Sequence, residues 1–257
     1  MPWFRAAEQL AVEVSPSAWR AVAAARTRES TRQIKAWAHF TSEGARAEDL
    51  REFRVRERLP FEASVILWPH AEDRGVCGLD ERPRSAVTLP KARVIRERLT
   101  AFVRGGGRAR DVLLPHEAAG RLAALAGWTY AGVLLLEPNA ACIAVVDGDE
   151  VAGAYLSWSS VASPSTEHGR LLAPYQFAAR LVPHLRGWSA NGAGAVLAVC
   201  GHHPDLRSAV VPIVEELDQE IDVLDGALVG GGTDLGATGH ESASYQLAWA
   251  VAAAGLR

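Results

Sequence analysis

The chain has 257 residues, of which 49% are apolar and 22% charged, and its formal net charge is −3. This length allows one large domain or two modest ones, and the apolar fraction is sufficient for a sizeable core. A chain with a small negative charge and no cluster of Lys and Arg lacks the electrostatic footprint of a nucleic-acid-binding protein, so we expect no nucleic-acid partner.

Cysteine spacing and the absence of long apolar runs exclude further classes. The three cysteines, Cys77, Cys142 and Cys200, are far apart and show no Cys-x-x-Cys spacing. This pattern argues against a zinc site or a disulfide framework and fits a reducing compartment. The first residues contain no apolar signal core, and no apolar run reaches the roughly 18 residues that a transmembrane helix needs. We therefore expect a cytoplasmic protein with no membrane span of its own.

Two stretches, residues 9–40 and 131–160, show the same order of predicted elements. In each, an apolar strand with Glu at or beside its end is followed by a turn of Ser, Pro or Asn, a second strand and a third. The predicted strands are 10–14, 18–25 and 33–40 in the first stretch, and 133–137, 141–146 and 150–158 in the second. Asp147 and Gly148 favour a hairpin, since both residue types tolerate positive φ. Each half therefore begins with an antiparallel meander.

Helices and single strands follow each meander. After the first, we predict helix 46–57, strand 63–68, strand 85–89, helix 91–103, strand 112–114 and helix 115–125. After the second, we predict helix 171–185, strand 195–199, helix 205–217 with Asp205 as its N-cap, strand 221–224 and helix 242–254. Apolar strands without alternation are buried on both faces, which requires helices on both faces of a mixed sheet.

The fold class is thus α/β, with two similar lobes of mixed sheets flanked by helices, residues 1–129 and 130–257. A meander followed by helix, strand, helix, strand and helix, repeated twice, is the order of the actin-like ATPase fold, whose lobes are ribonuclease H-like. Internal duplication at about half the chain length supports the two-lobe division.

Short motifs resemble one branch of this fold, the PilM family of type IV pilus assembly proteins. Residues 54–62, Arg-Val-Arg-Glu-Arg-Leu-Pro-Phe-Glu, resemble the PilM segment in which a helix runs into a Leu/Ile-Pro-Phe element. Residues 90–118 resemble the rest of that family's first lobe, and residues 195–224 resemble the run that closes its nucleotide cleft. The final residues, 245–257, are similar to its Ala-rich terminal helix. The resemblance covers nearly the whole chain, although each motif is short.

The resemblance implies positions for a nucleotide, and this chain departs from the family pattern at each of them. Active members have an Asp-x-Gly-rich turn after the first strand of each meander, because backbone amides must approach phosphate and Asp organises Mg²⁺. Here both turns lack Asp and contain proline, which removes an amide donor. The candidate cofactor-binding residues are Glu13, Ser15 and Ser17 in the first turn, Glu137 and Asn139 in the second, and Gly201 and His202 at the adenosine position.

Two alternatives remain open for these residues. Glu13 and Glu137 either face each other across the cleft or are carboxylates at strand ends that face solvent. His202 and His203 either contact a metal or a base, or form a plain entry turn to the helix that Asp205 caps.

The resemblance implies a non-catalytic PilM-like cytoplasmic scaffold of a type IV pilus or type II secretion assembly, peripheral to the inner membrane. Its implied partners are the cytoplasmic tail of a PilN-like membrane protein, laid near strand 63–68 and helix 91–103, and other assembly proteins. The cytoplasmic domain of the secretion protein GspL shares this fold. The alternative is an active ATPase or sugar kinase that holds Mg²⁺ through Glu13 or Glu137 and phosphate through Ser15, Ser17 and Asn139. A third possibility is ATP as a purely structural ligand.

Overall fold

The computed structural model describes residues 8–15, 18–27, 31–41, 46–69, 99–100, 102–104, 106–138, 140–157, 178–179, 181–183, 185–186, 196–230 and 239–256. Its first half contains β1 (Glu8–Val14), β2 (Trp19–Arg26), β3 (Arg32–Phe40), α1 (Arg46–Arg56), β4 (Glu62–Leu67), β5 (Arg108–Leu113) and α3 (Pro115–Ala126). Its second half contains β6 (Tyr130–Glu137), β7 (Ala140–Asp147), β8 (Glu150–Ser157), β9 (Val196–Cys200), α5 (Leu206–Leu217), β10 (Asp222–Val223) and α6 (Gly239–Ala254).

The strands form two five-stranded sheets with the same internal order. The first sheet runs β3-β2-β1-β4-β5 and the second runs β8-β7-β6-β9-β10. In each, three strands form an antiparallel meander, and the first strand of the meander also pairs in parallel with the single strand that follows. The predicted duplication and the mixed α/β fold class are therefore confirmed.

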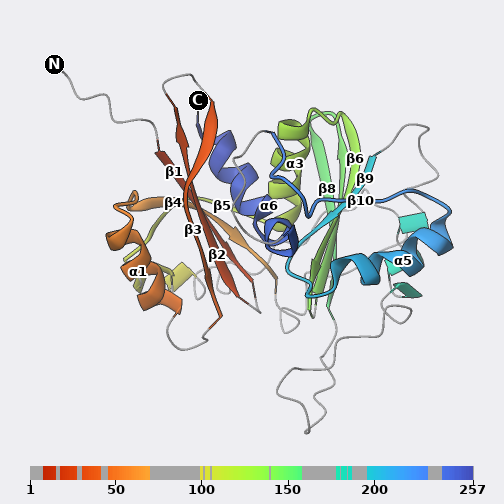
Figure 1. The fold of residues 1–257 in the computed structure, drawn as a ribbon, viewed down its shortest axis with the longest axis horizontal. Coiled ribbons are helices and arrows are strands. Elements are labelled where there is room, and N and C mark those ends of the chain that lie inside the picture. The colour runs from red at the N-terminus through yellow and green to blue at the C-terminus, as the bar shows by residue number, and fades with distance from the viewer. Residues whose placement is uncertain are drawn as a thin grey trace, which may run out of the picture.

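Both faces of the inner strands β1, β2, β4 and β6 are buried, because successive side chains of a strand point to opposite faces and both sets are mainly apolar. In β1, Leu10 and Val12 belong to a cluster with Leu50 and Phe53 of α1, whereas Ala11 belongs to the cluster between the sheets. Helix α5 covers the outer face of the second sheet in the same way. Figure 1 shows the resulting layers, with α1 outside one sheet, α5 outside the other, and α3 and α6 between them.

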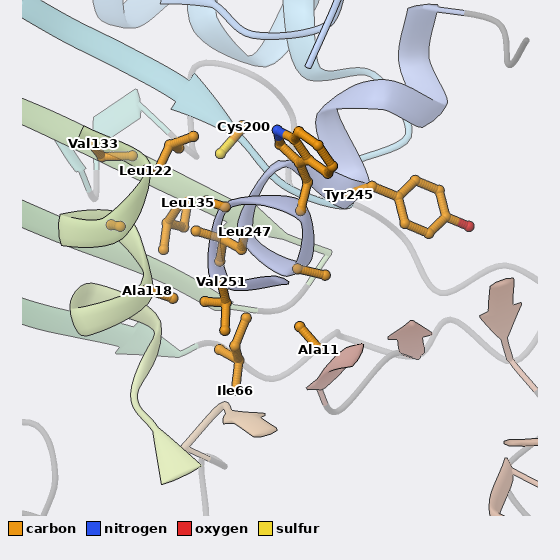
Figure 2. Close-up of a cluster of buried hydrophobic side chains, with 14 of the residues drawn as sticks. Ala11, Ile66, Ala118, Leu122, Val133, Leu135, Cys200, Tyr245, Leu247 and Val251 are labelled. Carbon is orange, nitrogen blue, oxygen red and sulfur yellow. The ribbon is translucent and has the colours of Figure 1, made fainter. Parts of the chain in front are cut away.

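The two middle helices cross between the halves of the chain. Helix α6, the last element, packs against β1 and β2, whereas α3 from the first half packs against β7 and β8, and the two helices contact each other. In Figure 2, Leu247 and Val251 of α6 lie in one buried cluster with Leu122 of α3, Ile66 of β4 and Leu135 of β6. Each sheet takes its strands from one half of the chain, whereas each middle helix packs mainly against the sheet of the other half. The division at residue 129 stays a prediction.

Most predicted elements that fall on described residues are present, although several differ in length: β1, β6 and α6 each begin two or three residues earlier than predicted. β5 begins at Arg108 rather than at Val112, because it is an edge strand whose exposed positions take charged residues and so lack a continuous apolar run. β10 covers only Asp222 and Val223. Predicted strand 85–89, and much of predicted helices 91–103 and 171–185, lie outside the described residues. No helix within the described ranges is long and apolar enough to cross a membrane.

Candidate functional site

Glu13 and Arg20 face each other across the first hairpin. They are directly paired in the register of β1 and β2, so their side chains point to the same face of the sheet. Nη2 of Arg20 donates a hydrogen bond to Oε1 of Glu13 over 3.0 Å, and Nε1 of Trp68 donates to the same oxygen over 2.6 Å. All three residues are buried, so this ion pair lies away from solvent.

The second sheet supplies the other half of this arrangement. Glu137, the last residue of β6, accepts a hydrogen bond of 2.5 Å from Nη2 of Arg20 at its Oε1. Its Oε2 lies 3.0 Å from the hydroxyl of Ser15, which also accepts a hydrogen bond from the amide of Ala18 over 3.1 Å. One guanidinium nitrogen thus touches carboxylates from both lobes. We call Glu13, Ser15, Arg20, Trp68 and Glu137 the interlobe cluster.

Burial controls the charges in the interlobe cluster. The pKa of Glu13 is raised from 4.5 to about 7. Burial is the largest cause, and the nearby charge of Glu137 adds to it. The charge of Arg20 and the hydrogen bond from Trp68 lower the pKa, but by less. Burial by itself would lower the pKa of Arg20, but the two carboxylates reverse this effect and raise the pKa of the guanidinium. Arg20 therefore remains a cation between two carboxylates.

Two imidazoles extend the contact between the lobes. The rings of His39 on β3 and His202, in the loop after β9, are edge to face with centroids 4.6 Å apart. Burial, with the neighbouring His202 and Arg20, lowers the pKa of His39 to about 4, and burial also lowers the pKa of His202. Nδ1 of His202 lies 3.2 Å from the hydroxyl of Ser244 on α6. Both rings are therefore neutral near pH 7, although His39 lies at an exposed position of β3 and His202 is half-buried.

Gly201 brings the loop after β9 against the backbone of β6. Its φ is +125°, and a Cβ placed on it would lie 2.2 Å from the carbonyl oxygen of Leu136. Its amide donates to the carbonyl of Ala243 over 3.0 Å, which ties the loop to the start of α6. This position requires glycine for close packing, since any side chain would overlap the β6 backbone.

The structure brings five of the seven predicted site residues to one boundary between the sheets. These are Glu13, Ser15, Glu137, Gly201 and His202. The other two, Ser17 and Asn139, lie outside the described residues. The alternative in which the two carboxylates face solvent is wrong, because Glu13 is 2% exposed and Glu137 is 0% exposed.

The expected entry turn to α5 is present. Oδ1 of Asp205 accepts a hydrogen bond from the amide of Ser208 over 3.3 Å, so Asp205 is the N-cap, as predicted. Nδ1 of His203 accepts from the amide of Asp205 over 3.2 Å. His203 therefore takes part in the helix entry, whereas His202 points to the other lobe.

Sequence reasoning missed Arg20, although a signal was present. Arg20 is the only charged residue in the otherwise apolar strand predicted at residues 18–25. A charge in a strand that is buried on both faces needs a buried partner, and this rule points toward Glu13 on the preceding strand. Trp68 and His39 carried no comparable signal, because a Trp and a His are ordinary residues in strands of this kind.

The two buried carboxylates are the candidate ligands for the Mg²⁺ of a nucleotide. Mg²⁺ takes oxygen ligands and usually binds one or two carboxylates together with phosphates. An ion bridging Glu13 and Glu137 would have to lie where the guanidinium of Arg20 lies. Within the described ranges, no group of three or more His, Cys, Asp and Glu side chains is arranged to hold a metal. In this structure the guanidinium of Arg20 therefore takes the place between Glu13 and Glu137 that Mg²⁺ would need.

A second feature is a groove on the first lobe at the end of α1. It has a volume of about 860 Å³. Its lining residues are Glu8, Lys35, Arg51, Arg54, Val55, Arg58, Leu59, Pro60, Phe61 and Gly106. Val55 is 73% exposed and Phe61 is 78% exposed. The guanidinium of Arg54 lies 5.1 Å from the centroid of the Phe61 ring and donates to the carbonyls of Pro60 and Gly106, so it fixes the wall of the groove.

Several solved structures share the fold of this chain. The chain is similar to a PilM–PilN type IV pilus biogenesis complex with a TM-score of 0.67 and 14% identity, over 98% of this chain and 100% of that chain. The chain has the actin-like ATPase fold. The ethanolamine utilization protein EutJ from Carboxydothermus hydrogenoformans matches with a TM-score of 0.56 and 12% identity, over 97% of this chain and 90% of that one.

An actin-like relative with a nucleotide also matches. The activator of 2-hydroxyisocaproyl-CoA dehydratase from Clostridium difficile, solved with bound ADPNP, has a TM-score of 0.53 and 9% identity, over 97% of this chain and 94% of that chain. No protein-family model matches the chain, and no curated protein matches it by sequence. The expected resemblance to PilM is confirmed at the level of the actin-like fold.

Proposed function

We propose that this protein is a nucleotide-independent PilM-like scaffold of a type IV pilus or type II secretion assembly. In this role it lies at the cytoplasmic face of the inner membrane, held by the cytoplasmic tail of a PilN-like membrane protein. The similarity to the PilM–PilN complex, which extends over 98% of this chain, is the observation that carries the pilus assignment. The interlobe cluster supports the absence of nucleotide, because Arg20 occupies the space between the two carboxylates.

The groove at the end of α1 is our candidate site for the tail. Exposed apolar side chains next to a wall of fixed geometry are typical of surfaces that bind a peptide. Val55 and Phe61 supply the apolar contacts, while Arg51 and Arg58 add positive charge. The tail that fits is an extended segment with apolar side chains and at least one carboxylate. The expected strand 63–68 lies beside this groove and is buried, so it supports the wall rather than contacting the tail.

A binding titration tests this proposal. The probe is a fluorescent peptide with the cytoplasmic residues of the host's PilN-like protein, titrated with wild type and with a Val55→Ser, Phe61→Ser variant. The control is Val211→Ser, because Val211 is an apolar residue of α5 that is 52% exposed on the other lobe. We expect the groove variant to lose about tenfold or more in affinity and the control to match wild type. No binding to wild type, or equal binding by the groove variant, would contradict the proposal.

One observation favours a nucleotide-dependent alternative, an actin-like ATPase or sugar kinase. The dehydratase activator has the same fold and was solved with ADPNP. Calorimetry with ATP and Mg²⁺ separates the two functions, since the scaffold proposal expects no heat of binding. Binding that a Glu13→Ala, Glu137→Ala variant abolishes would favour the alternative and identify these carboxylates as its metal site.

A further inference from the structure

We propose that Arg20 is a built-in cation that occupies a metal-like site formed by carboxylates of both lobes, and that it holds the lobes together without any ligand. This inference concerns the interlobe cluster and does not depend on the partner bound at the groove. Its consequence is that the connection between the lobes, which a bound cation could provide, is supplied here by a side chain of the protein itself.

The oxygens around Arg20 form a donor set suited to a cation. Glu13 and Glu137 contribute Oε1 atoms 3.0 Å and 2.5 Å from Nη2, and Ser15 places a hydroxyl 3.0 Å from the other oxygen of Glu137. Carboxylate oxygens are ligands that hard divalent cations prefer, and the hydroxyl of Ser15 holds the Glu137 carboxylate in place. The guanidinium has taken this place, and it is 0% exposed.

Stability alone does not explain this arrangement. A buried ion pair contributes little net stability compared with apolar residues of similar size, because both charges lose their hydration. In addition, Nε and Nη1 of Arg20 have no hydrogen-bond partner among the described residues, which adds a further penalty. What the pair does provide is a specific connection, since Arg20 meets a carboxylate from each sheet only in one relative placement of the lobes.

The interlobe cluster lies where the central strands of the two sheets end, which suits a connection between the lobes. Glu137 is the last residue of β6 and Glu13 is next to the last of β1, so the ion pairs join the carboxyl ends of two central strands. Helices α3 and α6 join the sheets through the apolar core between them. The lobes are thus joined by an apolar contact along the helices and by a charged contact at the strand ends.

A distance measurement between the lobes tests the proposal. Spin labels are placed at Val55→Cys on α1 and Val211→Cys on α5, both exposed and on opposite outer layers (Figure 1). Cys77 is replaced by Ser, and the remaining cysteines are buried. The test variant adds Arg20→Met, Glu13→Gln and Glu137→Gln, which removes all three charges without leaving a buried charge unpaired. We expect a narrow distance distribution for the parent and a broad one for this neutral variant. A narrow distribution in both would overturn the proposal, because the lobes would then be held without the ion pairs.

A second measurement tests the cation site itself. Arg20→Ala leaves the two carboxylates and opens a space between them. We expect excess Mg²⁺ to raise the melting temperature of this variant by about 5 °C, and to leave wild type and the neutral variant unchanged. If Arg20→Ala does not fold without metal, Mg²⁺ should restore folding. No response of Arg20→Ala to Mg²⁺ would overturn the assignment of a metal-like site.

Discussion

Arg20 of β2 and Glu137 of β6 are 117 positions apart in the sequence, yet Nη2 of the arginine lies 2.5 Å from Oε1 of the glutamate. This contact joins the two sheets at the ends of their central strands. The same nitrogen also contacts Glu13 within the first sheet. Because these charges are buried, their removal has consequences that stability measurements can detect.

Replacement of Arg20 by Met should strongly destabilise the fold. The variant leaves Glu13 and Glu137 buried without a counter-ion, and breaking a buried ion pair in this way costs about 3–5 kcal/mol. The matched control is Arg186→Met, which removes an exposed ion pair of 3.0 Å with Glu216 and should cost less than about 1 kcal/mol. Urea unfolding monitored by circular dichroism measures both. Similar losses in the two variants would show that burial of the interlobe charges does not matter.

The raised pKa of Glu13 predicts a pH dependence of stability. With a pKa of about 7 in the folded chain and 4.5 ordinarily, Glu13 keeps its proton longer when folded than when unfolded. Its contribution to stability is therefore full below pH 4.5 and is lost as the pH rises to about 7. Glu13→Gln has no carboxyl group at this position and therefore does not show this loss. As the pH rises from 4.5 to about 7, the free energy of unfolding should fall less in the variant than in wild type. The slope can reach about 1.4 kcal/mol per pH unit.

His39 should give the opposite pH dependence. Its pKa is lowered from 6.5 to about 4, so its contribution to stability is full above pH 6.5 and is lost as the pH falls toward 4. Because His39 lies at an exposed position of β3, solvent screens part of this effect, and a His39→Phe variant should lose only slightly less stability than wild type on acidification. Unfolding series for wild type, Glu13→Gln and His39→Phe between these pH values would measure both effects. Parallel curves for all three proteins would contradict both assignments.

Gly201→Ala should destabilise the loop between β9 and α5. The residue has a φ of +125°, and its Cβ would lie 2.2 Å from the carbonyl oxygen of Leu136, so the variant must move the β6 backbone or the loop. We expect a loss of about 2 kcal/mol or more. Gly226→Ala is the control, because a Cβ at that position meets nothing within 4 Å. Thermal unfolding of the two variants should differ clearly, and equal melting temperatures would refute the close approach at Gly201.

ATP with Mg²⁺ should not change the melting temperature of wild type. A ligand that binds the folded state adds about 2.7 kcal/mol at a hundred times its dissociation constant, which thermal shift detects easily. In the interlobe cluster Arg20 lies between the two carboxylates, so we expect no shift with millimolar nucleotide. A clear shift would support nucleotide as a ligand and would contradict the scaffold proposal in its nucleotide-independent form.

Local patterns were sufficient to predict most of the fold. The strands of both meanders, α1, α3, α5 and the N-cap at Asp205 all follow from apolar periodicity, turn residues and capping chemistry, which act within a few positions of the chain. The repeat of the same element order then indicated two similar sheets. β5 was predicted too short because its charged edge positions hide the strand.

The sequence by itself thus determined which elements form, the actin-like order of those elements and the glutamates at or beside the ends of two strands, Glu13 and Glu137. Only the tertiary structure decided that these carboxylates meet, that Arg20 lies between them, and that α6 covers the first sheet rather than the second. The reason is physical. Strands and helices depend on neighbours in the sequence, whereas the partner of a buried charge is selected by the packing of elements more than a hundred residues apart, which no local pattern records.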